Sequence, residues 1–97
     1  MLPTPHFDKE LYRQILIREG DNFLERKNFD EAIRKYSCAL ELQQTSLVYS
    51  KRAIAFKFKN DLAYASQDCN NAIQLQPYYH EPYATRGELY KIQGNFN

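Results

Sequence analysis

Apolar side chains recur at steps of three and four residues along the N-terminal part of the chain. An α-helix has about 3.6 residues per turn, so this spacing places them on one face and predicts a long amphipathic helix that ends at about Arg26. Thr4 and Pro5 suit its start, because Thr can accept from a free backbone N–H and Pro has none to satisfy. The apolar positions of this helix are Phe7, Leu11, Tyr12, Ile15, Leu16, Phe23 and Leu24.

The same spacing predicts three further helices, over residues 28–42, 46–59 and 62–75. A fifth helix has Pro82 in its first turn and ends at Gly94, which can adopt the left-handed conformation that closes many helices. No segment alternates with period two, so we expect no β-sheet. The candidate N-caps are Asn28 or Asp30 for the second helix, Thr45 or Ser46 for the third, and Asp61 for the fourth.

The helical pattern itself repeats. Matching residues stand 33 positions apart, and that period indicates stacked helix pairs rather than one globular core. Stacked pairs leave an elongated surface on which another molecule can be held, so the repeat favours binding over catalysis. The matching pairs are Phe29/Leu62, Ala32/Ala65, Tyr36/Cys69, Ala39/Ala72, Leu40/Ile73 and Leu42/Leu75.

These residues resemble the tetratricopeptide repeat, a helix pair with small and aromatic side chains at fixed spacings. The resemblance implies an all-α, right-handed superhelical solenoid of antiparallel helix pairs. It divides the chain into an N-terminal extension with the start of the first helix (1–12), repeat one (13–45), repeat two (46–79) and the first helix of a truncated third repeat (80–97). The first copy is carried by Gly20, Phe23, Asn28, Phe29, Ala32, Tyr36, Ala39, Leu40 and Leu42. The second is carried by Tyr49, Ala53, Phe56, Asp61, Leu62, Ala65, Cys69, Ala72, Leu75 and Pro77, and the third begins with Tyr83, Gly87, Tyr90, Gly94, Asn95 and Phe96.

The repeated positions have a packing role. Small residues let antiparallel helices approach closely, and aromatic residues fill the space between repeats. Cys69 stands where Tyr36 stands one repeat earlier, which leaves room that Tyr64 or Tyr79 is expected to fill. The small positions are Gly20, Ala32, Ala53, Ala65 and Gly87, and the aromatic ones are Phe23, Phe29, Tyr36 and Phe56.

Composition narrows the function. The chain of 97 residues is 43% apolar and 26% charged, as in folded proteins. Its formal net charge is only +1, and positive and negative residues are interspersed along the sequence without a basic cluster, so we expect no nucleic acid partner. No apolar run is long enough to span a bilayer, and the two cysteines lack metal-ligand or redox spacing. We therefore expect a cytoplasmic protein with reduced cysteines, without a cofactor or metal. His6 and His80 are isolated, and no nucleophile or phosphate loop is recognisable, so we predict no enzyme.

The resemblance implies a concave groove lined by the first helix of each repeat. Helical spacing selects its residues, several of which are apolar, and this predicts a peptide or helix of a partner protein as ligand. The alternative, that these side chains only contact neighbouring loops, stays open. The groove residues are Gln14, Ile17, Arg18, Asp21, Leu24, Ser50, Lys51, Ile54, Lys57, Phe58, Glu81, Ala84, Glu88 and Lys91.

One subclass of the family, found in co-chaperones, grips the C-terminal carboxylates of large heat-shock chaperones with a clamp of Lys, Asn and Arg side chains. Short motifs of this chain are similar to that subclass, but the residues that form the clamp are replaced by others. A carboxylate would be repelled by Asp21 and Glu81, so we predict no tight binding of an acidic chaperone tail, with Arg18 and Lys51 as the only stand-ins. The residues at the clamp positions are Ile17, Asp21, Lys51, Glu81 and Thr85.

The third repeat contains only its first helix, so its apolar side chains are expected to lack partners and to form a sticky patch. We therefore expect the chain to be the N-terminal part of a longer polypeptide, or to be covered by another chain or a second copy. Its first predicted function is an adaptor or scaffold that binds a partner through the groove. The second is a structural subunit that packs through its last helix, and a reader of chaperone tails ranks third. The possible assembly surface is Tyr83, Leu89, Tyr90, Ile92 and Phe96.

Overall fold

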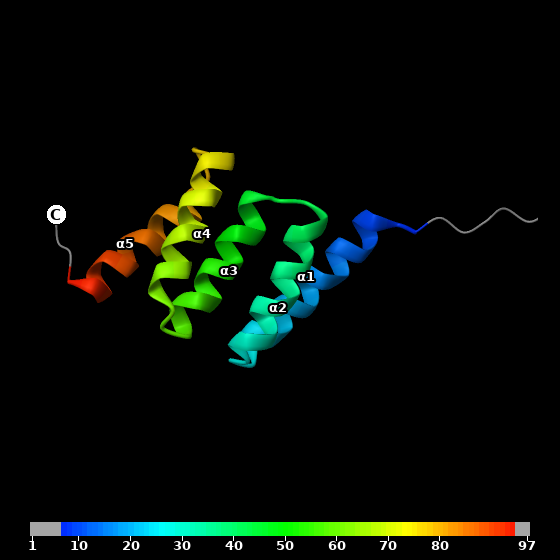
Figure 1. Ribbon diagram of the computed structural model, residues 1–97, viewed down its shortest axis with the longest axis horizontal. Coiled ribbons are helices and arrows are strands. Elements are labelled where there is room, and N and C mark those ends of the chain that lie inside the picture. Colours follow the sequence, from blue (N-terminus) through cyan, green and yellow to red (C-terminus); the bar gives the residue numbers. More distant parts are fainter. Residues whose placement is uncertain (1–6, 95–97) are drawn as a thin grey trace, which may run out of the picture.

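Five α-helices and short connections make up the computed structural model, which describes residues 7–94 (Figure 1). No strand is present among these residues, so the prediction of an all-α protein is confirmed. No helix within this range is long and apolar enough to cross a membrane. The helices are α1 (Lys9–Glu25), α2 (Phe29–Leu42), α3 (Ser46–Phe58), α4 (Leu62–Leu75) and α5 (Glu81–Gln93).

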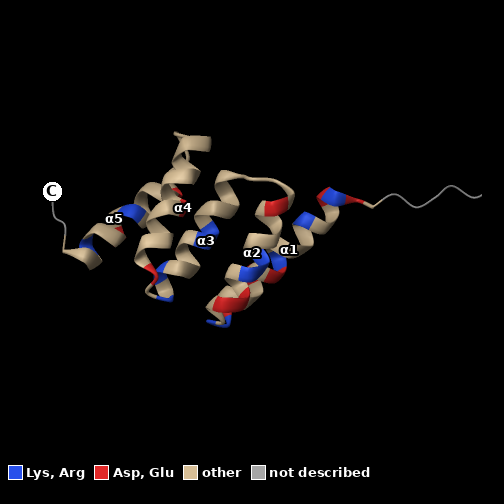
Figure 2. Ribbon diagram, in the orientation of Figure 1, with Lys and Arg blue, Asp and Glu red and all other residues tan. Residues whose placement is uncertain are grey.

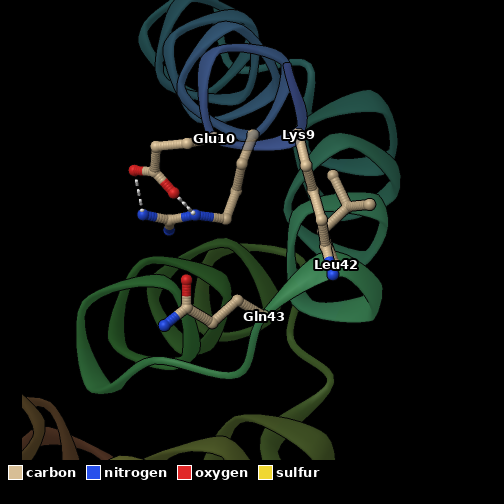
Figure 3. A pocket seen from close by; sticks show the side chains of 5 residues that line it. Lys9, Glu10, Leu42 and Gln43 are labelled. Carbon is tan, nitrogen blue, oxygen red and sulfur yellow. Dashed lines mark hydrogen bonds and ion pairs between the residues drawn. The ribbon is translucent and has the colours of Figure 1, made fainter. Parts of the chain in front are cut away.

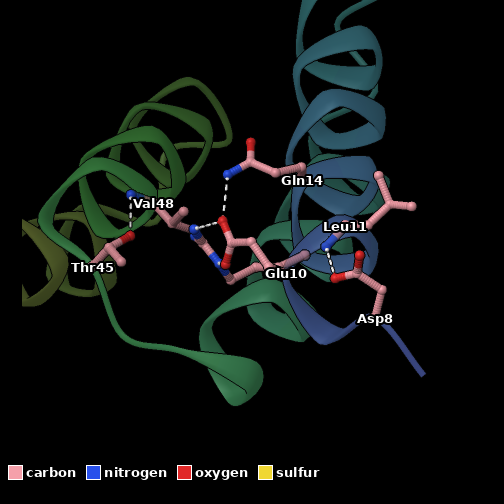
Figure 4. Close-up of polar contacts among 7 residues, drawn as sticks. Asp8, Glu10, Leu11, Gln14, Thr45 and Val48 are labelled. Atoms are coloured by element: carbon pink, nitrogen blue, oxygen red, sulfur yellow. Dashed lines mark hydrogen bonds and ion pairs between the residues drawn. The ribbon is translucent and has the colours of Figure 1, made fainter. Parts of the chain in front are cut away.

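Side-chain caps fix where three of the helices begin. The carboxylate of Asp8 accepts a hydrogen bond from the Leu11 N–H at 2.9 Å, so α1 starts later than predicted, and Thr4 and Pro5 lie outside the described residues (Figure 4). Asn28 caps α2, and Thr45 caps α3 by accepting from the Val48 N–H at 3.3 Å, which decides two of the open alternatives. Asp61 stands at the N-cap of α4 without a side-chain hydrogen bond to that helix.

Three helices end on a residue with positive φ. Lys27 follows α1 with φ of 63°, Asn60 follows α3 with 69°, and Gly94 follows α5 with 78°. The first two turns have the same hydrogen-bond pattern. The N–H of Asn28 donates to the Phe23 carbonyl at 2.8 Å, and the N–H of Asp61 donates to the Phe56 carbonyl at 2.9 Å. The two repeats therefore turn the chain in the same way with different residues.

The helices pack as successive antiparallel pairs. α1 packs on α2 and α3 on α4, while α2 contacts α3, and α5 contacts both α4 and α3 (Figure 1). The core forms two clusters, one around Tyr36 in the first pair and one around Cys69 in the second. Because α3 is packed by three other helices, it is the central element of the molecule.

The predicted packing roles are met in part. The ring of Tyr36 lies against Gly20, where an added Cβ would be 2.5 Å from Cε1 of the ring. Cys69 is buried beside Leu89, whereas Tyr64 is exposed and stacks on Phe56 with the ring centroids 5.3 Å apart, so Tyr64 does not fill the space beside Cys69. The role of Gly87 stays a prediction, because within residues 7–94 an added Cβ there would meet nothing within 4 Å.

Candidate functional site

The central helix α3 carries only positive charge, and each of its cations is paired with a different helix. Lys51, Arg52 and Lys57 are its charged residues, and Figure 2 shows blue without red along this helix. Nζ of Lys51 lies 3.0 Å from Oδ1 of Asp21 on α1, and Nζ of Lys57 lies 2.7 Å from Oε2 of Glu88 on α5. These two pairs bring α1, α3 and α5 side by side on one surface, which we call the first-helix face.

Asp21 receives two donors from different helices. The hydroxyl of Tyr36 on α2 donates to its Oδ1 at 2.6 Å, and Nζ of Lys51 donates to Oδ1 and Oδ2 at 3.0 and 3.1 Å. Burial, together with the hydrogen bond to Asp21, raises the pKa of the Tyr36 hydroxyl far above its usual value. The hydroxyl therefore stays protonated and donates, and the Asp21 carboxylate is neutralised within the protein.

The third cation of α3 joins the two helix pairs. Arg52 donates from Nε and Nη2 to both carboxylate oxygens of Asp68 on α4, each at 2.8 Å, and from Nη1 to Oγ of Ser37 on α2 at 2.9 Å. Burial raises the pKa of the Asp68 carboxyl, and the Arg52 guanidinium opposes that shift. The hydrogen bonds to Asp68 raise the pKa of the Arg52 guanidinium. This bridge was not predicted, because the sequence shows that Arg52, Asp68 and Ser37 are present but not that they contact one another.

Most predicted groove residues lie on the surface, but two do not. Ile17 is 7% exposed and Ser50 is 2% exposed, so we correct the expectation that they contact a ligand. Ile17 packs into the first core cluster, and Ser50 faces inward because α3 is covered by three helices. Half-buried positions are Asp21, Leu24, Lys51, Ile54 and Lys57; exposed positions are Gln14, Arg18, Phe58, Glu81, Ala84, Glu88 and Lys91.

The positions of the carboxylate clamp are occupied by groups that do not favour an anion. Ile17 and Thr85 are buried, Asp21 and Lys51 neutralise each other, and Glu81 is exposed as a carboxylate. Lys51, one of the two expected stand-ins, is thus already engaged, whereas Arg18 is exposed on α1.

A depression of about 390 Å³ lies where the turn after α1 meets the end of α3. The rings of Phe29 and Phe58 stack in its wall with centroids 5.5 Å apart and planes 15° from parallel. Leu24, Glu25 and Lys27 complete the lining, so two predicted groove residues, Leu24 and Phe58, share one pocket. Phe29 was assigned to packing, and Glu25 and Lys27 were missed.

A second depression, of about 310 Å³, lies between the start of α1 and the end of α2 (Figure 3). Nη2 of Arg13 lies 2.7 Å from Oε1 of Glu10 in its wall, and the Arg13 and Gln14 hydrogen bonds lower the pKa of Glu10 to about 2. Its remaining lining is Lys9, Leu42 and Gln43, and of its charged residues Arg13 and Glu10 are paired with each other.

The last helix exposes aromatic and aliphatic side chains. Tyr83, Tyr90 and Ile92 are 40%, 42% and 54% exposed. Leu89, predicted on the same surface, is instead fully buried against Ala53, Ala65 and Cys69, because it faces the second helix pair. Phe96 lies outside the described residues.

Reactive side chains are few. Within residues 7–94, no three His, Cys, Asp or Glu side chains are grouped as metal ligands. Cys38 is half-buried and Cys69 is buried, and they are not joined. Burial raises the pKa of the Cys69 thiol to about 11, so it is protonated and unreactive at neutral pH.

No protein-family model matches the chain. Mitochondrial import receptor subunit TOM70 of Saccharomyces cerevisiae is 28% identical over 89 residues, which cover 92% of this chain and 14% of TOM70. RNA polymerase II-associated protein 3 of Gallus gallus is 34% identical over 84 residues, covering 84% of this chain and 12% of that protein. The chain thus spans only a small part of the length of these relatives.

A solved structure extends the similarity to the fold. It is the first TPR (tetratricopeptide repeat) of Spaghetti (RPAP3) bound to the HSP90 peptide SRMEEVD, with a TM-score of 0.83 and 25% sequence identity. The match covers 93% of this chain and 71% of that one.

Proposed function

Because the chain is a tetratricopeptide-repeat protein, we propose that it is a protein-interaction module that binds a segment of a partner along the first-helix face. The observation that carries the proposal is the alignment of α1, α3 and α5 by the Lys51–Asp21 and Lys57–Glu88 pairs. Arg18 and Phe58 are exposed and Ile54 is half-buried, so we expect these three side chains to be available to a ligand. The neighbouring structure, which holds a peptide, supports the same class of ligand.

The charges of this face argue against a free C-terminal carboxylate as the principal ligand group. An incoming carboxylate would have to displace Asp21 from Lys51, or Glu88 from Lys57, and would also meet Glu81. Each displacement breaks an ion pair and leaves a second carboxylate nearby, so the net gain is small. We propose that side chains of the partner segment, rather than its terminus, supply most of the binding energy.

The partner is best identified by capture with the tagged chain, followed by mass spectrometry. Two pairs of variants then locate the binding surface: Ile54→Ala with Phe58→Ala on the first-helix face, and Tyr90→Ala with Ile92→Ala on α5. We expect the first pair to weaken capture by tenfold or so, about 1.4 kcal/mol, and the second pair to leave it unchanged. Loss with the α5 pair alone would instead support the structural-subunit alternative.

The absence of a carboxylate clamp is tested separately. A fluorescently labelled SRMEEVD peptide, the sequence bound in the neighbouring structure, should show no micromolar affinity for this chain by anisotropy. The same peptide with an amidated C-terminus should behave alike. A micromolar dissociation constant that is lost on amidation would contradict the proposal.

A second candidate function is a permanent assembly through α5, and the exposure of Tyr83, Tyr90 and Ile92 favours it. Sedimentation velocity of the purified chain distinguishes the two. A monomer across concentrations supports the groove-binding module, whereas self-association that Tyr90→Ala and Ile92→Ala abolish supports the assembly role.

A further inference from the structure

We infer that the depression formed by Leu24, Glu25, Lys27, Phe29 and Phe58 is a pocket for one bulky apolar side chain of an acidic partner segment. The inference rests on the proposed function and adds the chemistry of the segment that is bound. We call this depression the Phe29–Phe58 pocket.

The walls of the pocket suit an apolar side chain. Its volume of about 390 Å³ lies at the small end of the range of roughly 300–1,000 Å³ typical of ligand sites. Phe58 is 58% exposed although it stacks on Phe29, so part of the ring pair remains uncovered. Covering that surface with a ligand side chain removes apolar area from water and adds aromatic contacts.

The charges around the pocket favour an acidic segment. Asp30 is paired with Lys59, with Nζ and Oδ1 2.7 Å apart, and Glu88 is paired with Lys57. In the turn after α1, Arg26 and Lys27 have no carboxylate within 4 Å among the described residues, and Glu25 is the one carboxylate that lines the pocket. Two unpaired cations beside one carboxylate leave this rim net positive, which complements acidic residues flanking the apolar side chain.

The backbone at Lys27 is a second, independent observation. Its φ of 63° lies in the left-handed region, which L-residues other than Asn and Gly adopt at a cost. The corresponding turn positions hold Asn60 and Gly94, the residue types that tolerate this conformation. A lysine at a strained position that also lines a pocket points to a role for its charge.

The test uses three blocked seven-residue peptides, acetylated and amidated so that no terminal carboxylate is present. One has a central phenylalanine flanked by two glutamates on each side, the second replaces that phenylalanine with alanine, and the third replaces the glutamates with lysines. Titration of the ¹⁵N-labelled chain should show saturable amide shifts at residues 24–29 and 57–59 for the first peptide. We expect at least tenfold weaker binding for the other two.

A variant with a stabilised turn and its matched control separate binding from folding. Lys27→Gly should raise the melting temperature and yet weaken the acidic phenylalanine peptide about fivefold, so that the loss is not due to unfolding. Asn60→Gly is the matched control in the equivalent turn and should leave binding unchanged. Phe58→Ala should weaken the same peptide by fivefold or more.

The inference would be overturned by shifts located elsewhere, by equal binding of the lysine peptide, or by undiminished binding to Lys27→Gly. Its failure is distinguishable from failure of the proposed function. The short peptides probe the pocket alone. Ile54→Ala without Phe58→Ala, assayed in the capture experiment, probes the first-helix face outside the pocket, because Ile54 does not line it.

Discussion

The two helix pairs solve the same packing problem with side chains of different size. In the pair α1/α2, the ring of Tyr36 lies against Gly20, where a Cβ would clash. In the pair α3/α4, the residues 33 positions later are Cys69 and Ala53, both fully buried. A large residue therefore faces no side chain in one pair. In the other pair a small residue and a methyl group share one core cluster with Leu89 of α5.

The same comparison explains a charge. The buried hydroxyl of Tyr36 needs an acceptor, and Asp21 supplies it; the residue 33 positions after Asp21 is Ile54, and Cys69 needs no such acceptor. Asp21 is then neutralised by Lys51 from the next pair. The presence of Tyr36 in the core thus accounts for the Asp21–Lys51 ion pair on the first-helix face.

A second pair of equivalent positions reverses its charges. Arg52 and Asp68 correspond to Glu19 and Lys35, again 33 residues apart. Arg52 forms a bidentate bridge to the buried Asp68, whereas Nζ of Lys35 lies 3.3 Å from Oε1 of Glu19, whose side chain is 45% exposed. Equivalent positions thus form an ion pair between helices in both repeats, and the burial of each pair determines how much it contributes to the free energy of unfolding.

The largest effect is expected from breaking the buried bridge. Arg52→Ala leaves the Asp68 carboxylate buried without its partner and should lower the free energy of unfolding by about 3–5 kcal/mol. Lys35→Ala, which removes the cation of the more exposed pair, should cost at most about 1 kcal/mol. Urea unfolding followed by circular dichroism measures both, and equal losses would remove the distinction between the two links.

The next effect tests the size complementarity of the pairs. Gly20→Ala pushes a methyl group into the Tyr36 ring and should destabilise the chain by about 1–3 kcal/mol. Combining it with Tyr36→Cys converts the first pair to the residues of the second, so the double variant should lose less than the sum of the single losses. Strict additivity would show that the two residues do not share their space.

The helix boundaries and core of the described chain were largely predictable, because spacing and capping chemistry are local. The ends of α2 and α4 and the left-handed Gly94 were predicted correctly. Which side chains pair across helices was not predictable. Burial of Ile17 and Leu89 and the bridge from Arg52 depend on how the helices are rotated against one another, and neighbouring positions on an amphipathic helix differ little in the sequence.

A smaller effect depends on pH. Burial raises the pKa of the Cys69 thiol from 9.0 to about 11, so the folded chain binds this proton more tightly than the unfolded chain. The resulting stability is complete below about pH 9 and is lost as the pH rises toward 11. Between pH 8 and pH 10, Cys69→Ala should therefore lose about 1 kcal/mol less of its unfolding free energy than the unmodified chain. Parallel losses in the two proteins would assign the alkaline sensitivity to other groups.

The smallest effect concerns the turns that the two pairs share. Lys27→Gly removes the side chain from a left-handed residue and should stabilise the chain by about 0.5–1 kcal/mol, since the relief of strain exceeds the added entropy of the unfolded chain. Asn60→Gly should gain only a few tenths of a kcal/mol, because Asn already tolerates this conformation. Thermal unfolding of both variants compares the stability gained in the two turns. A loss of stability in Lys27→Gly would show that the backbone at Lys27 is not strained.

Amide chemical-shift mapping of a captured partner segment on the ¹⁵N-labelled chain tests the central claim most directly. The account predicts shifts centred on Arg18, Ile54 and Phe58, continuing into the Phe29–Phe58 pocket. Shifts confined to Tyr90, Ile92 and the outer side of α5 would contradict it.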